Sequence, residues 1–278
     1  MQRYQALGIK KLCRWLGVST SGYYAWRKRE KSLRAQEDDE LLKHITHIYW
    51  DSQGRYGSPR VHKALQRQGI YVGKKRVARL MQEQGLVARV TQVTRKAPGV
   101  KRFKSQGENL LENGPEVDGL NQVWVADVTY IKLKHWYYLA TIMDKYSRRI
   151  IGWALDKHRT TELTERALRY AQKKRGYPKG VIFHTDRGVE FTNHSFQKQL
   201  KRYNFKHSVN RPGRCTDNAH MESFYHSLKG ELIRGTVYRK AKDLRKSIGG
   251  YINKFYNAVR LHSALDYCSP MEYELNIG

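Results

Sequence analysis

The spacing of hydrophobic and polar positions predicts helices in the first third of the chain. Up to about residue 97, apolar residues recur three and four positions apart, which is the period of a helix with one buried face. Two stretches show this period most clearly, and their apolar positions are Val61, Ala64 and Leu65, then Val77, Leu80 and Met81. Because residues 69–73 begin and end with glycine, we expect a tight turn between the two short helices.

Weaker helical patterns precede this helix-turn-helix. A further helix is expected from Glu37 to Tyr49, and Ser58 with Pro59 is typical of the first turn of the helix that follows. We therefore divide this part of the chain into an N-terminal helical segment, residues 1–40, and a helix-turn-helix DNA-binding domain, residues 41–97.

Beyond residue 120 the period changes to that of strands. Three runs rich in β-branched and aromatic residues predict sequential strands at 123–131, 136–143 and 149–155. The other expected elements, in chain order, are a helix at 162–174, a strand at 181–183, a helix at 193–202, a strand at 207–209 and helices at 218–233 and 243–256. This order of elements is that of a ribonuclease H-like core.

The predicted fold class is therefore α/β. We expect a ribonuclease H-like core, with a mixed five-stranded sheet flanked by helices, preceded by a small all-α helix-turn-helix region. Residues 98–120 are rich in turn formers and are expected to be a linker. The core then covers residues 121–235, and residues 236–278 form a C-terminal helical extension.

The charge of the chain indicates nucleic acid as its partner. Lysine and arginine number 53 against 25 aspartate and glutamate, a formal net charge of +28 in 278 residues. The excess is concentrated between Arg55 and Lys104, where 14 basic residues stand against one acid, Glu83. Such a segment repels itself unless a polyanion neutralises it, as the phosphates of DNA do.

Other features exclude several classes of protein. The longest apolar run, Trp136 to Met143, is far below the roughly 20 residues that a membrane-spanning helix needs. The N-terminus lacks the pattern of a secretory signal, and the three cysteines stand too far apart for a disulfide framework. His184, Cys215 and His220 lack a fourth ligand at zinc-like spacing. We expect a cytoplasmic protein without membrane contact.

Four basic residues open the second helix of the expected helix-turn-helix: Lys74, Lys75, Arg76 and Arg79. A helix with a cationic first turn suits the major groove of DNA, as recognition helices of such motifs do. The alternative is an ordinary solvated face on a helical hairpin. We favour DNA contact because the whole surrounding stretch is basic, rather than this helix alone.

Three carboxylates lie at positions that the predicted strands and helices do not explain. Asp127 lies in the middle of the first predicted strand, where aspartate is depleted. Asp186 follows the strand at 181–183, and Glu222 borders the apolar stripe of the helix at 218–233. Brought together, the three repel unless a divalent cation lies between them, and oxygen ligands select Mg²⁺ or Mn²⁺ over zinc. Two ions are expected, because a pair serves phosphoryl transfer.

In this setting the three acids resemble the triad of the DDE transposase and retroviral integrase superfamily. Asp186 lies in His-Thr-Asp-Arg-Gly, Glu222 lies in Asp-Asn-Ala-His-Met-Glu-Ser-Phe, and 35 residues separate the two. Lys229, seven residues after Glu222, fits the same pattern. More narrowly, the chain resembles the second-frame product, OrfB, of the IS-three family of bacterial insertion sequences. The stretches that carry this likeness are Ser21 to Trp26, Tyr56 to Arg60, Arg76 to Met81, Asp144 to Arg149 and Tyr256 to His262.

The resemblance implies an enzyme that cuts a strand at the terminal inverted repeats of an element. The freed 3′ hydroxyl then attacks a second phosphodiester, and no covalent protein intermediate is needed. The implied partners are double-stranded DNA with terminal inverted repeats, target DNA and further copies of the chain on the nucleoid. An upstream-frame product with a helix-turn-helix and a leucine zipper is also implied, as an assisting or fused partner.

Beyond the triad, we assign DNA contact to Lys229, Arg60, Arg211, Arg260 and His262. Helical geometry places Lys229 on the same face as Glu222, where its ammonium could grip a phosphate near the element's terminal nucleotides. The alternative is a surface lysine paired with a nearby acid such as Asp217 or Glu231. Two other functions stay open: a ribonuclease H-like nuclease that only hydrolyses, and a DNA-binding regulator with an inactive core.

Overall fold

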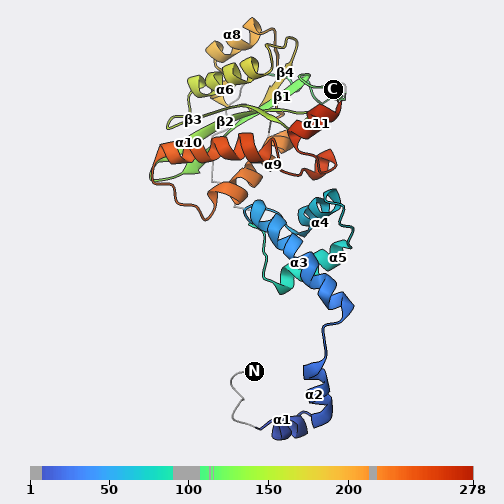
Figure 1. The fold of residues 1–278 in the computed structure, drawn as a ribbon. Coiled ribbons are helices and arrows are strands. Elements are labelled where there is room, and N and C mark those ends of the chain that lie inside the picture. The colour runs from blue at the N-terminus through green and yellow to red at the C-terminus, as the bar shows by residue number, and fades with distance from the viewer. Residues whose placement is uncertain (1–7, 90–106, 113, 115, 213–217, 278) are drawn as a thin grey trace. The chain divides into compact units, whose positions relative to one another are not determined.

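The computed structural model describes residues 8–89, 107–112, 114, 116–212 and 218–277. The chain divides into two compact units, Met1–Val87 and Ala88–Gly278, which are described separately here and can be followed by colour in Figure 1. No helix in the described part of the chain is long and apolar enough to span a membrane.

The first unit is entirely helical. Its helices are α1 (Ile9–Trp15), α2 (Thr20–Lys28), α3 (Leu33–Asp51), α4 (Ser58–Arg67) and α5 (Lys74–Glu83). The predicted helix-turn-helix is confirmed as α4 and α5, and the apolar positions expected to face inward are buried on both, among them Val61, Leu65 and Val77. Gly69 joins the two helices with φ of 79°, a conformation that glycine adopts without strain.

Helix α3 begins earlier than its pattern predicted. Ser32 caps it, because its hydroxyl oxygen accepts a hydrogen bond from the backbone N–H of Ala35 at 3.2 Å. The helix therefore runs across the boundary that we placed between residues 40 and 41, and our domain limits remain proposals. The expected linker at 98–120 falls partly on residues outside the described ones.

The second unit is built on a mixed five-stranded sheet. Its strands are β1 (Val123–Lys132), β2 (Trp136–Asp144), β3 (Ile150–Asp156), β4 (Ile182–Thr185) and β5 (Lys206–Val209). Their spatial order is β3-β2-β1-β4-β5. The first three strands form an antiparallel meander, whereas β4 and β5 continue the sheet parallel to β1. The predicted α/β fold with a mixed sheet is confirmed.

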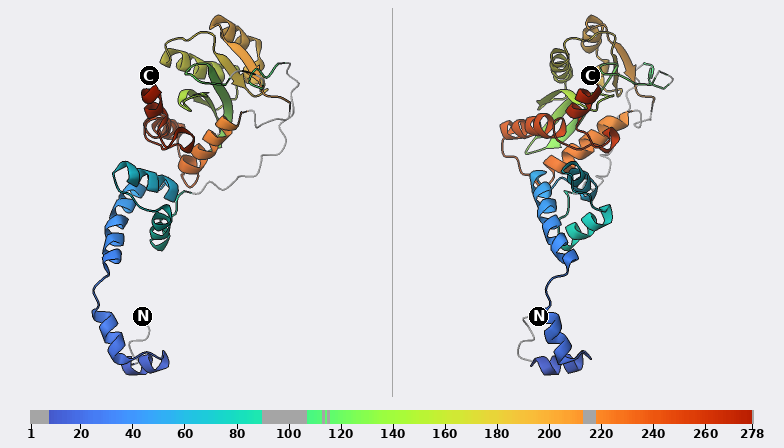
Figure 2. Two further views of the ribbon diagram at one scale, coloured as in Figure 1. Left: turned by 90° about the vertical axis from the view of Figure 1, so that its right-hand side faces the viewer. Right: turned by 45° about the vertical axis from the view of Figure 1, so that its right-hand side comes forward.

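Helices cover both faces of this sheet (Figures 1 and 2). The helices are α6 (Thr161–Lys174), α7 (Val189–Thr192), α8 (His194–Arg202), α9 (Ala219–Leu228), α10 (Ala241–Gly250) and α11 (Pro270–Ile277). Residues of α6 and α8 share one hydrophobic cluster with the sheet, centred on Trp124, Phe183 and Phe196. Residues of α9 and α10 share the other, which includes Val125, Phe224 and Ile248. The core therefore consists of two apolar layers separated by the strands.

Two long helices expected from the sequence are each interrupted. The helix predicted at 218–233 ends at Leu228 and continues as a π-helical segment, η3 (Lys229–Ile233). The helix predicted at 243–256 ends at Gly250 and continues as a second π-helical segment, η4 (Tyr251–Tyr256). Glycines, which have low helix propensity, lie at both changes, Gly230 in one and Gly249 with Gly250 in the other.

Candidate active site

The pairing of β1 with β4 brings Asp127 and Asp186 together. These parallel strands pair Val123 with Ile182 and Val125 with His184. Asp127 and Asp186 each follow the last of these pairs by two residues, and the charge of Asp186 acts on Asp127. Because side chains alternate along a strand, Asp127 lies on the same face as Val125, which is the face that α9 and α10 cover.

The pKa values of both carboxylates are raised. Burial raises the pKa of Asp127, and the neighbouring charge of Asp186 raises it further. Burial also raises the pKa of Asp186, with a second contribution from the charge of Glu190. Backbone N–H groups oppose these effects: Val128 donates to Oδ1 of Asp127 at 2.7 Å, and Gly188 donates to Oδ1 of Asp186 at 3.0 Å. Two acids held this way favour a shared proton or a bound cation.

Helix α9 is fastened to β1 beside Asp127. The side-chain N–H of Asn218 donates to the carbonyl oxygen of Ala126 at 3.0 Å, and the hydroxyl of Tyr225 donates to that of Asp127 at 2.6 Å. Glu222 follows Asn218 by four residues and precedes Tyr225 by three, a spacing that puts all three on one side of the helix. Glu222 is therefore carried by the element that lies against the first aspartate.

Glu222 itself is more exposed than the sequence predicted. The apolar stripe of α9 is buried as expected, but Glu222 lies outside it and faces solvent. No interaction within the described residues joins Glu222 to Asp127 or Asp186, and none of their His, Cys, Asp and Glu side chains form a group of three arranged to hold a metal. The structure thus unites the two aspartates and leaves the glutamate on the adjoining helix.

Sequence reasoning missed an ion pair beside the aspartates. The guanidinium of Arg159 donates to Oε1 of Glu190 at 2.8 and 2.5 Å, and the charges of both residues act on Asp127 and Asp186. The side chain of Glu190 is 1% exposed. A Cβ atom at Gly188 would lie 2.7 Å from the carboxylate of Glu190 and 2.9 Å from that of Asp186, so a side chain there would displace both carboxylates. The sequence signal was Glu190 itself, an acid four residues after Asp186.

Lys229 lies close to the aspartates. Its ammonium is 4.8 Å from the ring centroid of Tyr130, on β1. Burial lowers the pKa of Lys229, and the charge of Asp127 partly opposes that effect. Neither acid suggested as an alternative partner is seen with it: Glu231 pairs with Arg260, and Asp217 lies outside the described residues.

In the first unit, the four basic residues expected to bind DNA fall into two groups. Arg76 and Arg79 donate hydrogen bonds to Asp38 of α3, each at 2.6 Å, and thereby tie α5 to α3. Lys74 and Lys75 are exposed and pair with no acid in the described part of the chain. The lysines are therefore free to meet phosphates, whereas both arginines already stabilise the unit.

The other residues assigned to DNA contact also differ in their surroundings. Arg60 lies 5.9 Å from the ring centroid of Tyr56, and Arg211 pairs with Glu112 at the surface. Arg260 and His262 require a correction, because they are only 5% and 8% exposed. The guanidinium of Arg260 binds Glu231, so this motif builds the interior of the second unit and does not present these side chains to DNA.

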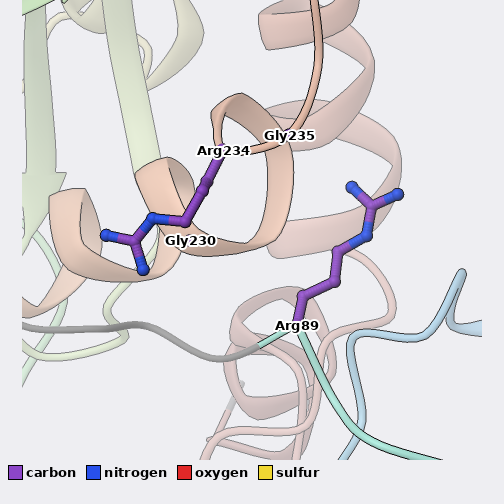
Figure 3. A pocket seen from close by; sticks show the side chains of 4 residues that line it. All are labelled: Arg89, Gly230, Arg234 and Gly235. Carbon is purple, nitrogen blue, oxygen red and sulfur yellow. The ribbon is translucent and has the colours of Figure 1, made fainter.

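A small recess lies elsewhere on the second unit (Figure 3). Arg89, Gly230, Arg234 and Gly235 line it, and Arg89 donates to the carbonyl oxygen of Glu231 at 3.2 Å. Its lining includes none of the carboxylates described above. The recess is therefore separate from the candidate active site.

A mixed sheet of this order, with an aspartate in β1 and another directly after β4, defines the integrase-like class of polynucleotidyl transferases. Residues 118–215 and 203–270 match the integrase core domain family, and residues 36–94 match the HTH-like domain family. The chain belongs to the transposases of IS3-type insertion sequences, as its curated relatives establish.

It is 37% identical over 282 residues to transposase InsF of insertion sequence IS3A from Escherichia coli strain K12, covering 99% of this chain and 96% of that protein. It is 35% identical over 263 residues to a 31 kDa protein of insertion element IS600 from Shigella sonnei, covering 94% and 97%. Among solved structures, the magnesium-bound HTLV-2 integrase catalytic core is similar, with a TM-score of 0.42, 20% identity and coverage of 55% of this chain and 96% of that one.

Proposed function

We propose that this transposase cuts DNA strands at the terminal inverted repeats of its element and joins each freed 3′ hydroxyl to a second phosphodiester. The observation that carries this proposal is the proximity of Asp127 and Asp186, together with the bonds that fasten α9, which bears Glu222, to β1. This proximity supports phosphoryl transfer because two half-buried acids with raised pKa values suit the binding of a hard cation.

The donor set fits Mg²⁺ or Mn²⁺. Asp127 and Asp186 supply oxygen atoms only, and a cation between them would relieve the repulsion that raises their pKa values. We infer that Glu222, which is exposed on α9, supplies the third carboxylate. Two such ions, when bound, would activate an attacking hydroxyl and stabilise a leaving 3′ oxygen.

The protein's own part in the reaction is to position and to bind. The bonds from Asn218 and Tyr225 to the β1 backbone hold α9, the helix that carries Glu222, against β1. Preorganisation of this kind contributes to rate because the reacting groups need no further ordering. No serine, tyrosine or cysteine nucleophile is required.

We infer that DNA is bound by both units. The exposed lysines of α5 are suited to the duplex of the element end, and Lys229 to a phosphate beside the carboxylates. We further propose that copies of the chain assemble on DNA with a target duplex, assisted by an upstream-frame product and located on the nucleoid.

A product assay tests this proposal. Full-length protein is incubated with Mg²⁺ and a duplex that ends in the element's inverted repeat and carries a labelled strand. We expect both a cleaved strand and longer, joined products. Cleavage without joining would support the nuclease, and binding without either would support the regulator; both results would overturn the transposase mechanism.

Lys229→Ala is expected to reduce end-specific cleavage and joining about tenfold or more, while nonspecific DNA binding falls by much less. The reason is that the ammonium lies near Asp127, where a phosphate of the terminal nucleotides would be bound. Lys229→Arg should keep part of the activity, because it keeps the charge but not the compact ammonium. Equal rates for Lys229→Ala and wild type at limiting DNA would contradict this role.

Replacing Lys74 and Lys75 together by alanine is expected to weaken binding of the repeat duplex and to lower its salt slope by about two, about one for each lost phosphate contact. The matched control is Lys43→Ala, because Lys43 is an exposed lysine on α3 that already pairs with Glu40. Fluorescence anisotropy at several salt concentrations measures both quantities. An unchanged slope in the double variant would show that these lysines are only solvated.

A further inference from the structure

Two basic side chains in the turn between β2 and β3 pair with no acid in the described part of the chain. Lys145 and Arg148 lie in this turn, and His220 lies in the first turn of α9, close enough that both cations act on it. None of the three pairs with an acid of the described residues, and Nη1 of Arg148 is buried there without a hydrogen-bond partner. A cation taken out of water without a counter-charge lowers stability.

The backbone conformation of Arg148 also lowers the stability of the folded protein. Its φ is 61°, in the left-handed region that residues with a side chain rarely adopt. The turn around it is held firmly, because Asp144 accepts hydrogen bonds from the N–H groups of Asn121 at 2.9 Å and of Tyr146 at 3.1 Å. Strain and an unpaired charge at one residue are typical of a binding site rather than of a structural contact.

The acid that reaches this turn, Glu274, is hydrogen-bonded to side chains other than Lys145 and Arg148. Glu274 of α11 accepts hydrogen bonds from Ser147, Arg149 and Arg175. The groups that act on Arg148 from the C-terminal segment are the hydroxyls of Tyr256 and Tyr273. Among the described residues, the groups that act on Arg148 are therefore two phenols and the neighbouring ammonium of Lys145, and no carboxylate pairs with it.

The position of this cluster relates it to the carboxylates. The N–H of Lys145 donates to the carbonyl oxygen of Val123 at 2.9 Å, and Val123 lies four residues, about 13 Å, before Asp127 on β1. His220 precedes Glu222 by two residues on α9. Lys229, at the other end of α9, lies over Tyr130, beyond Asp127. Cationic groups thus stand at both ends of α9, with the carboxylates between them.

We propose that Lys145, Arg148 and His220 form a phosphate subsite for the DNA strand that is held at the catalytic carboxylates. The proposal rests on the proposed function, because it takes the strand cut at the carboxylates as its ligand. A phosphate there would supply a negative charge that no described residue provides to Arg148, and an acceptor for its Nη1 atom.

Arg148→Asn tests the subsite with little risk to the fold, because asparagine tolerates positive φ better than other side chains of its size. For the full-length protein and the repeat-ended duplex, we expect the Kd to rise about tenfold and the salt slope to fall by about one. The melting temperature of the DNA-free variant should be unchanged or higher, since a buried cation is removed. Lys145→Gln should act in the same direction.

The matched control is Arg166→Gln. Arg166 is an arginine of the same unit that already pairs with Asp156 at 2.5 Å, so its loss should leave the Kd and the salt slope as they are. If Arg148→Asn lowers the melting temperature and leaves the slope unchanged, Arg148 is structural and the inference is overturned. If the wild-type protein neither binds nor joins the duplex, the proposed function fails instead.

Discussion

Asp127→Asn, Asp186→Asn and Glu222→Gln are each expected to reduce strand cleavage and joining at least about a thousandfold. Each amide keeps the shape of the side chain but removes a charged oxygen ligand, and a loss of about 4 kcal/mol of transition-state stabilisation corresponds to that factor. DNA affinity should stay near that of the wild type, because it comes from lysine and arginine elsewhere. Denaturing gels of labelled duplex with Mg²⁺ measure the rates, and filter binding measures the affinity.

The control for these variants is Asp156→Asn. Asp156 is a carboxylate of the same sheet, at the end of β3, where it pairs with Arg166. It should cleave and join at close to the wild-type rate. A variant of the triad that kept near wild-type strand joining would remove its residue from the site.

Arg260→Ala is expected to lower the free energy of unfolding by about 3–5 kcal/mol, because it leaves a buried carboxylate without its partner. The guanidinium of Arg260 donates to Glu231 at 2.7 and 3.0 Å, and Tyr251 donates to the same carboxylate at 2.7 Å. Burial alone would lower the pKa of Arg260, but the hydrogen bonds and charge of Glu231 outweigh it and raise that pKa. Urea unfolding followed by circular dichroism measures the loss.

Two further variants test whether burial makes the Arg260–Glu231 ion pair important for stability. Arg166→Ala, which removes an arginine whose side chain is 42% exposed, should cost no more than about 1 kcal/mol. Replacing Arg260 by methionine together with Glu231 by leucine should restore much of the stability, since no charge is then left buried. If Arg260→Ala is as stable as the wild type but binds DNA more weakly, the prediction is wrong and Arg260 contacts DNA.

The sequence predicted the sheet and the first two acids because their signals are local. An aspartate in the middle of the β-branched strand at 123–131 is unusual, and an aspartate just after a short apolar strand marks the edge of a sheet. The structure places β4 beside β1 and parallel to it. The parallel pairing of these two strands then brings their aspartates, Asp127 and Asp186, to neighbouring positions.

What the sequence could not show are contacts between residues far apart along the chain. Arg159 and Glu190 meet only because α6 and α7 pack together, and no periodicity encodes that meeting. In the same way, Asp38 of α3 pairs with Arg76 and Arg79 of α5. These two arginines of the predicted recognition helix therefore stabilise the first unit. The inward position of Arg260 depends on the π-helical turn that carries Glu231, which helical periodicity does not predict.

The central claim is that Asp127, Asp186 and Glu222 hold divalent cations as one site, and titration with Mn²⁺ tests it most directly. Isothermal calorimetry of the full-length protein with the repeat-ended duplex, first wild type and then each amide variant, gives the affinity without relying on catalysis. We predict that all three variants bind Mn²⁺ at least about tenfold more weakly than wild type, whereas Asp156→Asn binds it equally well. Wild-type affinity in Glu222→Gln would contradict the claim, because the site would then consist of the two aspartates alone.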